Sequence, residues 1–194
     1  MLQTLDGEQS EKTLDYVFEA FQRALTEKMD DYSIQAFALI LPSEGMIAEG
    51  GMDVIDPEAI HDARGSIKKS IARKFKAEIR AKYDELTAAM ESEGGELIID
   101  AEHIGQRSLR NVMLEYLCTI KDTPEEQIEA ADVAQKHFYS ASGMTDKMAA
   151  LSTLASMDGE GSTRQARSLR SHPKGQAGQN AAHPRSHCQA RGHH

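Results

Sequence analysis

Apolar side chains recur every three or four positions along most of the chain, which is the spacing of one face of an α-helix. Residues 11–29 show this pattern first, through Leu14, Val17, Phe18, Phe21, Leu25 and Met29. The run at 33–41, SIQAFALIL, is almost wholly apolar. A buried strand would fit it, but its alanines and its helical neighbours favour a buried helix. The glycine-punctuated segment at 42–52 predicts a loop or a single helical turn.

The strongest periodic signal covers residues 57–90. Asp56 can cap the first turn, and Pro57 suits the first helical position because its missing N–H would have no partner there. Steps of three, four or seven then connect Ile60, Ile67, Ile71, Phe75, Ile79, Tyr83, Leu86 and Met90. An unbroken helix of this length would be about 50 Å long. Gly65 costs about 1 kcal/mol relative to Ala, so the helix can kink or break there.

Three further helices are expected. Asp100 caps one at about 101–121, which is apolar on more than one face and is therefore expected between neighbours. The sequence TPEE at 123–126 is a capping box that opens a helix to about Ser140, with Ile128, Ala131, Ala134, Gln135 and Phe138 along one side. Gly143 ends that helix, and Thr145 caps the last one at 146–156.

No stretch has a convincing β-strand period, so the sequence predicts an all-α fold of five or six antiparallel helices in a bundle or a superhelical, HEAT-like stack. We expect a flexible N-terminus at 1–10, a helical domain at 11–158, and a tail at 159–194. The tail is rich in His and Arg, and its only large aliphatic residue is Leu169. It has too little apolar surface to offset its ordering entropy, which predicts disorder.

Charge is divided sharply between body and tail. Residues 162–194 hold six of the 22 basic residues and none of the 31 acidic ones, so residues 1–161 have a balance of −15. An acidic body disfavours nucleic acid as a partner. No apolar run approaches the roughly 18 residues that a membrane span needs, and the polar, acidic N-terminus does not resemble a secretory signal. A cytoplasmic location is expected, with a plastid as the alternative if a transit peptide lies upstream.

Candidate metal ligands are few and poorly spaced. Glu102 and His103 fit half of a zinc-protease helix motif, but the position one turn after His103 is Arg107, which repels a cation. The acidic residues around His61 are explained by helix capping and the helix dipole. The histidines of the tail and Cys188 match no tetrahedral spacing. Cys118 lies in an apolar helical pattern and is expected to be a buried thiol. No metal site and no disulfide framework is therefore predicted in this chain.

Polar residues at 107–111 interrupt a strongly apolar helix. Arg107, Arg110 and Asn111 share it with large aliphatic residues. An arginine in such a place usually pairs with an acid of a neighbouring helix or domain, and lining of a ligand cavity is the second possibility. No Ser-His-Asp or Cys-His arrangement and no phosphate-cradling glycine loop can be identified. The sequence predicts no catalytic residue.

Several motifs occur together in order: Leu41-Pro42, the segment IDPEAI at 55–60, the segment RSLRNVMLEYL at 107–117, and the segment MTDKMAAL at 144–151. Together they resemble the C-terminal half of aminopeptidase N, a zinc alanyl-aminopeptidase family, over about residues 14–157. The resemblance implies an all-helical superhelical domain that caps the catalytic cavity. It also gives Arg107, Arg110, Asn111, Met144, Thr145 and Asp146 as structural or cavity-lining candidates.

The zinc-binding H-E-x-x-H motif and the G-A-M-E-N motif of that family do not occur in this sequence. The resemblance therefore implies no catalytic residue here, and zinc only in the catalytic domain of the parent enzyme. That domain, normally in cis, is the expected partner; peptides bind only indirectly, and neither nucleic acid nor membrane is expected. The leading hypothesis is a truncated fragment that is inactive alone.

Two alternatives remain open at this point: a stand-alone helical-repeat module that binds proteins, and a metal-responsive tail on a helical body. The resemblance ends near 159–161, and we hypothesise that a shifted reading frame or retained intron supplies the tail. An intact, spliced transcript that encodes the same tail would refute this. The helices at 124–156 would lack neighbours on one face, which predicts exposed apolar surface and possible self-association.

Overall fold

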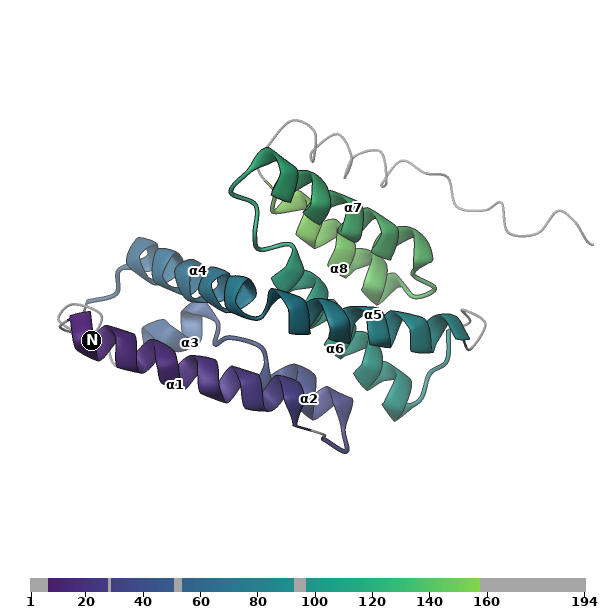
Figure 1. Ribbon diagram of the computed structural model, residues 1–194, viewed down its shortest axis with the longest axis horizontal. Coiled ribbons are helices and arrows are strands. Elements are labelled where there is room, and N and C mark those ends of the chain that lie inside the picture. The colour runs from purple at the N-terminus through teal and green to yellow at the C-terminus, as the bar shows by residue number, and fades with distance from the viewer. Residues whose placement is uncertain (1–6, 28, 51–53, 93–96, 158–194) are drawn as a thin grey trace, which may run out of the picture.

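Eight α-helices form the part of the chain that the structure, a computed structural model, describes: residues 7–27, 29–50, 54–92 and 97–157. They are α1 (Gly7–Thr26), α2 (Tyr32–Ala38), α3 (Glu44–Glu49), α4 (Pro57–Lys74), α5 (Lys76–Ser92), α6 (Ala101–Leu117), α7 (Pro124–Ser140) and α8 (Met144–Ala155). Figure 1 shows α1–α3 along one side of the α4–α5 run and the α7–α8 pair at the other. These residues contain no strand, and the predicted all-α fold is confirmed.

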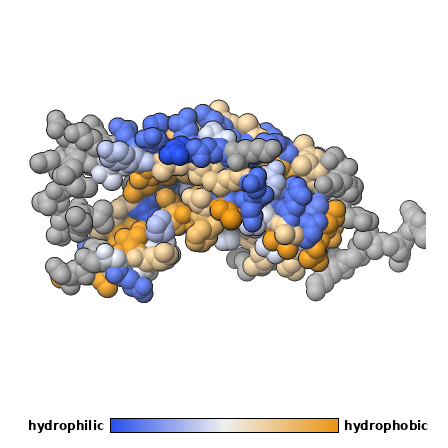
Figure 2. Space-filling view, turned by 90° about the horizontal axis from the view of Figure 1, so that it is seen from below, coloured by the Kyte–Doolittle hydropathy of each residue, from blue (hydrophilic) through white to orange (hydrophobic). Residues whose placement is uncertain are grey.

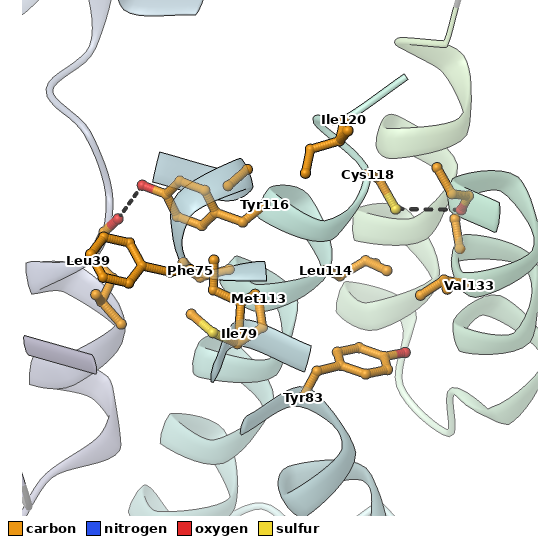
Figure 3. Close-up of a cluster of buried hydrophobic side chains, with 14 of the residues drawn as sticks. Leu39, Phe75, Ile79, Tyr83, Met113, Leu114, Tyr116, Cys118, Ile120 and Val133 are labelled. Atoms are coloured by element: carbon orange, nitrogen blue, oxygen red, sulfur yellow. Dashed lines mark hydrogen bonds between the residues drawn. The ribbon is translucent and has the colours of Figure 1, made fainter. Parts of the chain in front are cut away.

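Helix α6 forms the centre of the core. Leu109, Met113 and Leu114 are fully buried in it, which agrees with the prediction of a helix placed between neighbours. Figure 3 shows Met113 beside Ile79 of α5, and Leu114 on the side of Val133 in α7. One hydrophobic cluster therefore runs through α6 from the α1 side to the α8 side.

Aromatic rings fill the α1 side of this core. Phe21 stacks on Phe75 with ring centroids 5.5 Å apart, and it meets Tyr116 edge-on at 5.1 Å. Phe18 meets Phe75 edge-on at 6.1 Å. The hydroxyl of Tyr116 donates a hydrogen bond to the carbonyl of Leu39 over 2.7 Å, which joins α6 to the end of α2 (Figure 3). We call Phe18, Phe21, Phe75 and Tyr116 the aromatic cluster.

The long helix expected at 57–90 is interrupted, but not at Gly65. Gly65 lies within α4 with open space beside it. The interruption is at Phe75, whose φ of −111° and ψ of 22° lie outside helical values. Its N–H still bonds to Ile71 and its carbonyl still accepts from Ile79. Because Phe75 is buried in the aromatic cluster, ring packing against α1 explains why the helix deviates there rather than at the exposed glycine.

The segment at 33–41 is a helix, as favoured, with Asp31 as its N-cap. Its expected burial is wrong for one face. Ala36 and Leu39 are buried, whereas exposure remains high at Ile34 (61%), Phe37 (78%) and Ile40 (52%). The inner face packs on α6. The segment after Pro42 forms one short helix, α3, capped by Ser43.

The backbones of α2 and α6 approach each other closely at Gly105. A Cβ atom at this position would lie 2.9 Å from both the amide nitrogen of Ser33 and Cβ of Tyr32. Such distances are shorter than real Cβ contacts. Glycine is therefore what permits this crossing of α2 and α6.

Most predicted caps are confirmed. Asp56 accepts from the N–H of Ala59 and Asp100 from that of His103. Thr123 and Glu126 form the reciprocal capping box. The prediction of Thr145 as a cap is wrong, because α8 begins at Met144 with Gly143 as its N-cap and no side-chain cap bond.

The inner face of α7 differs from the predicted one. Ala134 is buried, and Ala131 and Phe138 are partly buried against the core, but Ile128 is 63% exposed. The remaining buried positions of α7 are Ala130, Val133 and His137. The inner face is therefore rotated by about one residue, because the buried imidazole of His137 takes part in the core and a hydropathy pattern counts it as polar.

The expected flexible N-terminus at 1–10 overlaps the first helix, since α1 already begins at Gly7. The disordered tail expected at 159–194 lies outside the described residues, as do the possible metal ligands within it. In the described part of the chain, no helix is both long and apolar enough to cross a membrane.

Candidate functional site

The structure brings together three of the six residues expected at a site. Arg110 and Asn111 of α6 meet Asp146 of α8, and we call these three residues the carboxylate cluster. Met144 and Thr145 are exposed and lie outside it. Arg107 is half-buried and donates through Nη1 to the carbonyl of Ile98 over 2.8 Å, which ties the preceding loop to α6.

Each oxygen of the Asp146 carboxylate faces one donor. Arg110 Nη2 lies 3.4 Å from Oδ2, and Asn111 Nδ2 donates to Oδ1 over 2.9 Å. Arg110 is 4% exposed and Asp146 is 1% exposed, so the pair is almost completely removed from water. Asp146 occupies the first turn of α8, where the helix dipole also favours a negative charge. The cluster therefore fastens the start of α8 to the middle of α6.

The electrostatics of Arg110 reflect this burial. Desolvation lowers the pKa of its guanidinium, and the neighbouring Asp146 acts in the opposite direction. Removing one partner of such a pair would leave an uncompensated buried charge. Among the described residues, no hydrogen-bond partner lies at Arg110 Nε or at Asn111 Oδ1. The cluster thus depends strongly on Asp146.

A second buried polar pair lies close to the cluster. The hydroxyl of Tyr83 and Nδ1 of His137 share a hydrogen bond of 3.0 Å, and the rings are 5.9 Å apart. Burial, and then Arg110, lower the pKa of His137 to about 3. Burial also raises the pKa of Tyr83. Both side chains are therefore neutral near pH 7.

Sequence reasoning missed His137 because a histidine on a helix is ordinarily counted as polar surface. One signal was available. His137 follows Val133 by four positions and Ala134 by three, which places all three on one face of α7. Tyr83, in contrast, was expected to be buried from its place in the periodic pattern of 57–90.

These groups stabilise the fold but do not form a nucleophile and base. His137 is neutral and almost fully buried. The thiol of Cys118 is buried and donates to the carbonyl of Ala130 over 3.4 Å (Figure 3). Burial raises the pKa of Cys118 to about 12, so the reactive thiolate is scarce at neutral pH. The arrangement is typical of a structural polar core.

The family resemblance implies zinc only in the catalytic domain of a parent enzyme, not among the residues described here. No group of three or more His, Cys, Asp or Glu side chains within residues 7–27, 29–50, 54–92 and 97–157 is placed to hold a metal ion. Nδ1 of His103 lies 2.6 Å from Asp100 Oδ1, which already caps the helix. Nδ1 of His61 lies 2.8 Å from Glu44 Oε1 in an exposed pair. Each of these two histidines therefore has a carboxylate partner.

Asn111 also borders a cavity of about 760 Å³ between α4, the end of α6 and α8. Lining of a cavity was one of the roles expected for this residue. Arg107 and Arg110 are not among the residues that line it. On the α4 side the cavity is lined by the basic side chains Arg64, Lys68 and Lys69.

Comparison with known proteins identifies relatives. The family described as "Domain of unknown function (DUF3458_C) ARM repeats" matches residues 1–176. Aminopeptidase N of Escherichia coli (strain K12) is 34% identical over 138 residues, which cover 71% of this chain and 14% of that protein. Aminopeptidase N of Haemophilus influenzae (strain ATCC 51907 / DSM 11121 / KW20 / Rd) is 27% identical over 136 residues, which cover 70% of this chain and 14% of that protein. The matches therefore span about one seventh of each relative.

Proposed function

The chain belongs to the DUF3458_C ARM-repeat family and corresponds to a C-terminal helical region of aminopeptidase N, and we propose on that premise that it supplies the helical domain that caps the catalytic cavity of such an enzyme. The proposed enzyme is a zinc metallopeptidase that removes residues from peptide N-termini. The family match over residues 1–176 is the observation that carries this proposal.

The surface of α2 supports a role in docking. Ile34, Phe37 and Ile40 follow one another at steps of three, and more than half of each side chain is exposed. Figure 2 shows hydrophobic surface at several places on the face seen from below, next to strongly hydrophilic areas. Exposed apolar patches commonly mark surfaces that another protein or domain covers. We propose that the rest of an aminopeptidase N-like chain covers this face of α2.

The α7–α8 pair supports the same reading. Exposed large side chains on these helices are Ile128, Tyr139, Met144 and Met148. Helical repeats bury such surface by stacking on the next repeat. Further helices of the parent enzyme would therefore cover the outer side of α7 and α8, and self-association is the expected behaviour when they are absent.

We propose that this chain does not catalyse peptide hydrolysis by itself. The sequence contains neither the H-E-x-x-H nor the G-A-M-E-N motif, and the buried pairs Tyr83–His137 and Arg110–Asp146 join side chains to each other within the core. Purified chain with added zinc is expected to release no aniline from an alanyl anilide. Hydrolysis that survives purification to homogeneity would refute this part of the proposal.

A chimera tests the cap role directly. The matching segment of the Escherichia coli relative is replaced by the corresponding residues of this chain, and alanyl anilide hydrolysis is measured. Retained activity in a folded chimera is expected, whereas a deletion of the segment should abolish it. A folded chimera as inactive as the deletion would contradict the proposal.

A matched pair of surface variants locates the docking face. In the chimera, Phe37→Ser should lower activity and the melting temperature, because Phe37 lies on the exposed face of α2. Tyr16→Ser is the control, since Tyr16 is a similarly exposed aromatic residue on α1 (73% against 78%). Equal effects of the two variants would remove α2 as the docking face and would favour a stand-alone module that binds another protein.

A further inference from the structure

Basic side chains gather around the 760 Å³ cavity between α4, the end of α6 and α8. Four cationic residues line it, namely Arg64, Lys68, Lys69 and Lys121, against two acidic residues, Glu115 and Asp122. The chain as a whole has a net charge of −9. A cavity with an excess of two positive charges is therefore opposite in sign to the rest of the molecule.

Two of the four cations are neutralised within the chain. Lys68 pairs with Glu115, and Lys69 pairs with Asp122, which also binds Arg73 from the next turn of α4. These pairs consume both acidic side chains of the cavity wall. They also fix the α4 side of the cavity relative to the end of α6.

The other two cations meet only neutral acceptors. Arg64 donates through Nε to the carbonyl of Pro42 over 2.8 Å, and Lys121 donates to the carbonyl of Ser156 at the end of α8. Among the residues that the structure describes, neither forms a salt bridge. The bond from Nε leaves the two terminal nitrogens of the Arg64 guanidinium as donors, and an ammonium has three N–H groups. Both residues line one cavity, and their positive charges have no acidic partner among the described residues.

The size and lining of the cavity suit a small polar molecule. Its volume falls within the roughly 300–1,000 Å³ typical of ligand sites. Besides the cations, its walls include four hydroxyl side chains, of which Thr119, Thr153 and Ser156 donate to backbone carbonyls and the fourth is Ser152. The arginine and lysine side chains are therefore the main donors of the cavity, and such groups bind phosphate and carboxylate oxygens through charge-assisted hydrogen bonds.

We propose that this cavity binds a small polyvalent oxyanion of the phosphate or carboxylate type, held between Arg64 on α4 and Lys121 after α6. The proposal is independent of the cap role, because both residues belong to this chain and the binding needs no catalytic domain. Binding of the anion would join α4 to the end of α8.

Calorimetric titration of the full chain with pyrophosphate and with citrate tests the proposal. Saturable binding of at least one of them is expected, and it should weaken with sodium chloride because the interaction is between charges. Binding of pyrophosphate alone would assign the site to phosphates, and binding of citrate alone would assign it to carboxylates. Absence of saturable binding for both at low salt would overturn the proposal.

Charge variants then locate the site. Arg64→Gln with Lys121→Gln should weaken binding about tenfold or more, since hydrogen bonds to charged groups contribute on that scale. Arg23→Gln with Lys136→Gln is the matched control: it also removes two positive charges, from exposed side chains that do not line this cavity. It should leave binding unchanged. Equal loss in both variants would show a general charge effect and overturn the assignment.

A variant that is expected to strengthen binding excludes misfolding as the cause of a weaker one. Glu115→Gln removes a negative charge from the cavity wall and releases Lys68, and Glu115 is itself exposed, so little effect on folding is expected. Binding of the same anion should become several-fold tighter. Weaker or unchanged binding in a fully helical Glu115→Gln chain would count against the proposal.

Discussion

The α1 side and the α8 side of helix α6 are packed by different chemistry. Toward α1 the contacts are rings, in the aromatic cluster of Phe18, Phe21, Phe75 and Tyr116. Toward α8 they include a buried charge pair with an amide, Arg110 and Asn111 with Asp146, and close to them the Tyr83–His137 hydrogen bond joins α5 to α7. Apolar packing loses stability gradually as atoms are removed, whereas a buried polar network fails when one member is lost.

The largest expected effect is therefore on the polar side. Asp146→Ala should lower the free energy of unfolding by about 3–5 kcal/mol, because it leaves the Arg110 charge buried and unpaired. Urea denaturation followed by circular dichroism measures the change. The double variant Arg110→Met with Asp146→Leu is the control and should lose much less, since an apolar pair replaces the ionic one. A larger loss in the double variant would contradict this account.

The second largest expected effect is a dependence of the unfolding free energy on pH, which arises only on the polar side. The pKa of His137 is about 3 in the folded chain, against about 6.5 in an unfolded one. The unfolded chain binds more protons between these values, so the contribution of His137 to stability falls as pH drops from about 6.5 toward 3. Between pH 7 and pH 5 this loss is about 2 kcal/mol.

His137→Gln should remove that part of the pH dependence. The measurement is the difference in unfolding free energy between pH 7 and pH 5, for the original chain and for the variant. Phe75→Leu, on the aromatic side, serves as the control because it changes no titratable group. An identical pH dependence in the original chain and His137→Gln would show that the imidazole is not kept neutral by the fold.

Phe75→Leu itself should lower the unfolding free energy at pH 7 by about 1–2 kcal/mol. The loss combines smaller apolar burial with the missing ring contacts to Phe18 and Phe21. The effect should be smaller than that of Asp146→Ala, because apolar packing loses stability gradually as atoms are removed. A Phe75→Leu chain as unstable as Asp146→Ala would remove the contrast between the two sides.

The smallest expected effects concern two glycines. Gly105→Ala should destabilise by about 1–2 kcal/mol, because the new Cβ meets α2 at 2.9 Å. Gly65→Ala should stabilise by up to about 1 kcal/mol, since nothing lies within 4 Å of its Cβ position and alanine favours the helix. Thermal melts of the two variants give both signs, and effects of equal sign would contradict the close approach of α2 and α6.

Periodicity predicted the helices well because burial of a face dominates where side chains are apolar. The four-residue spacing of Phe75, Ile79 and Tyr83 predicted the buried face that begins just before α5 and continues along it. The position of the break in the long helix was not predicted, because local propensity allows it at Gly65 whereas the deviation at Phe75 follows from a ring that packs against a distant helix. No local pattern contains that contact.

The candidate site was predictable only in part. An arginine in an apolar helix implies an acidic partner, and Arg110 does lie beside one, but the identity of Asp146 depends on how α8 returns to α6. The partner of His137 was not predictable for the same reason, since Tyr83 lies 54 residues away in the sequence. Residues that meet across helices become visible only when the packing is known.

The interruption at Phe75 has a consequence for how the molecule opens. It divides the longest helical run into α4, whose contacts are shared among α3, α6 and α1, and α5, which packs chiefly on α6. Amide protons of α4 should therefore exchange with solvent together with those of α1, while those of α5 should exchange with those of α6. The consecutive helices α4 and α5 would then belong to two separate cooperative units, with Phe75 at their boundary.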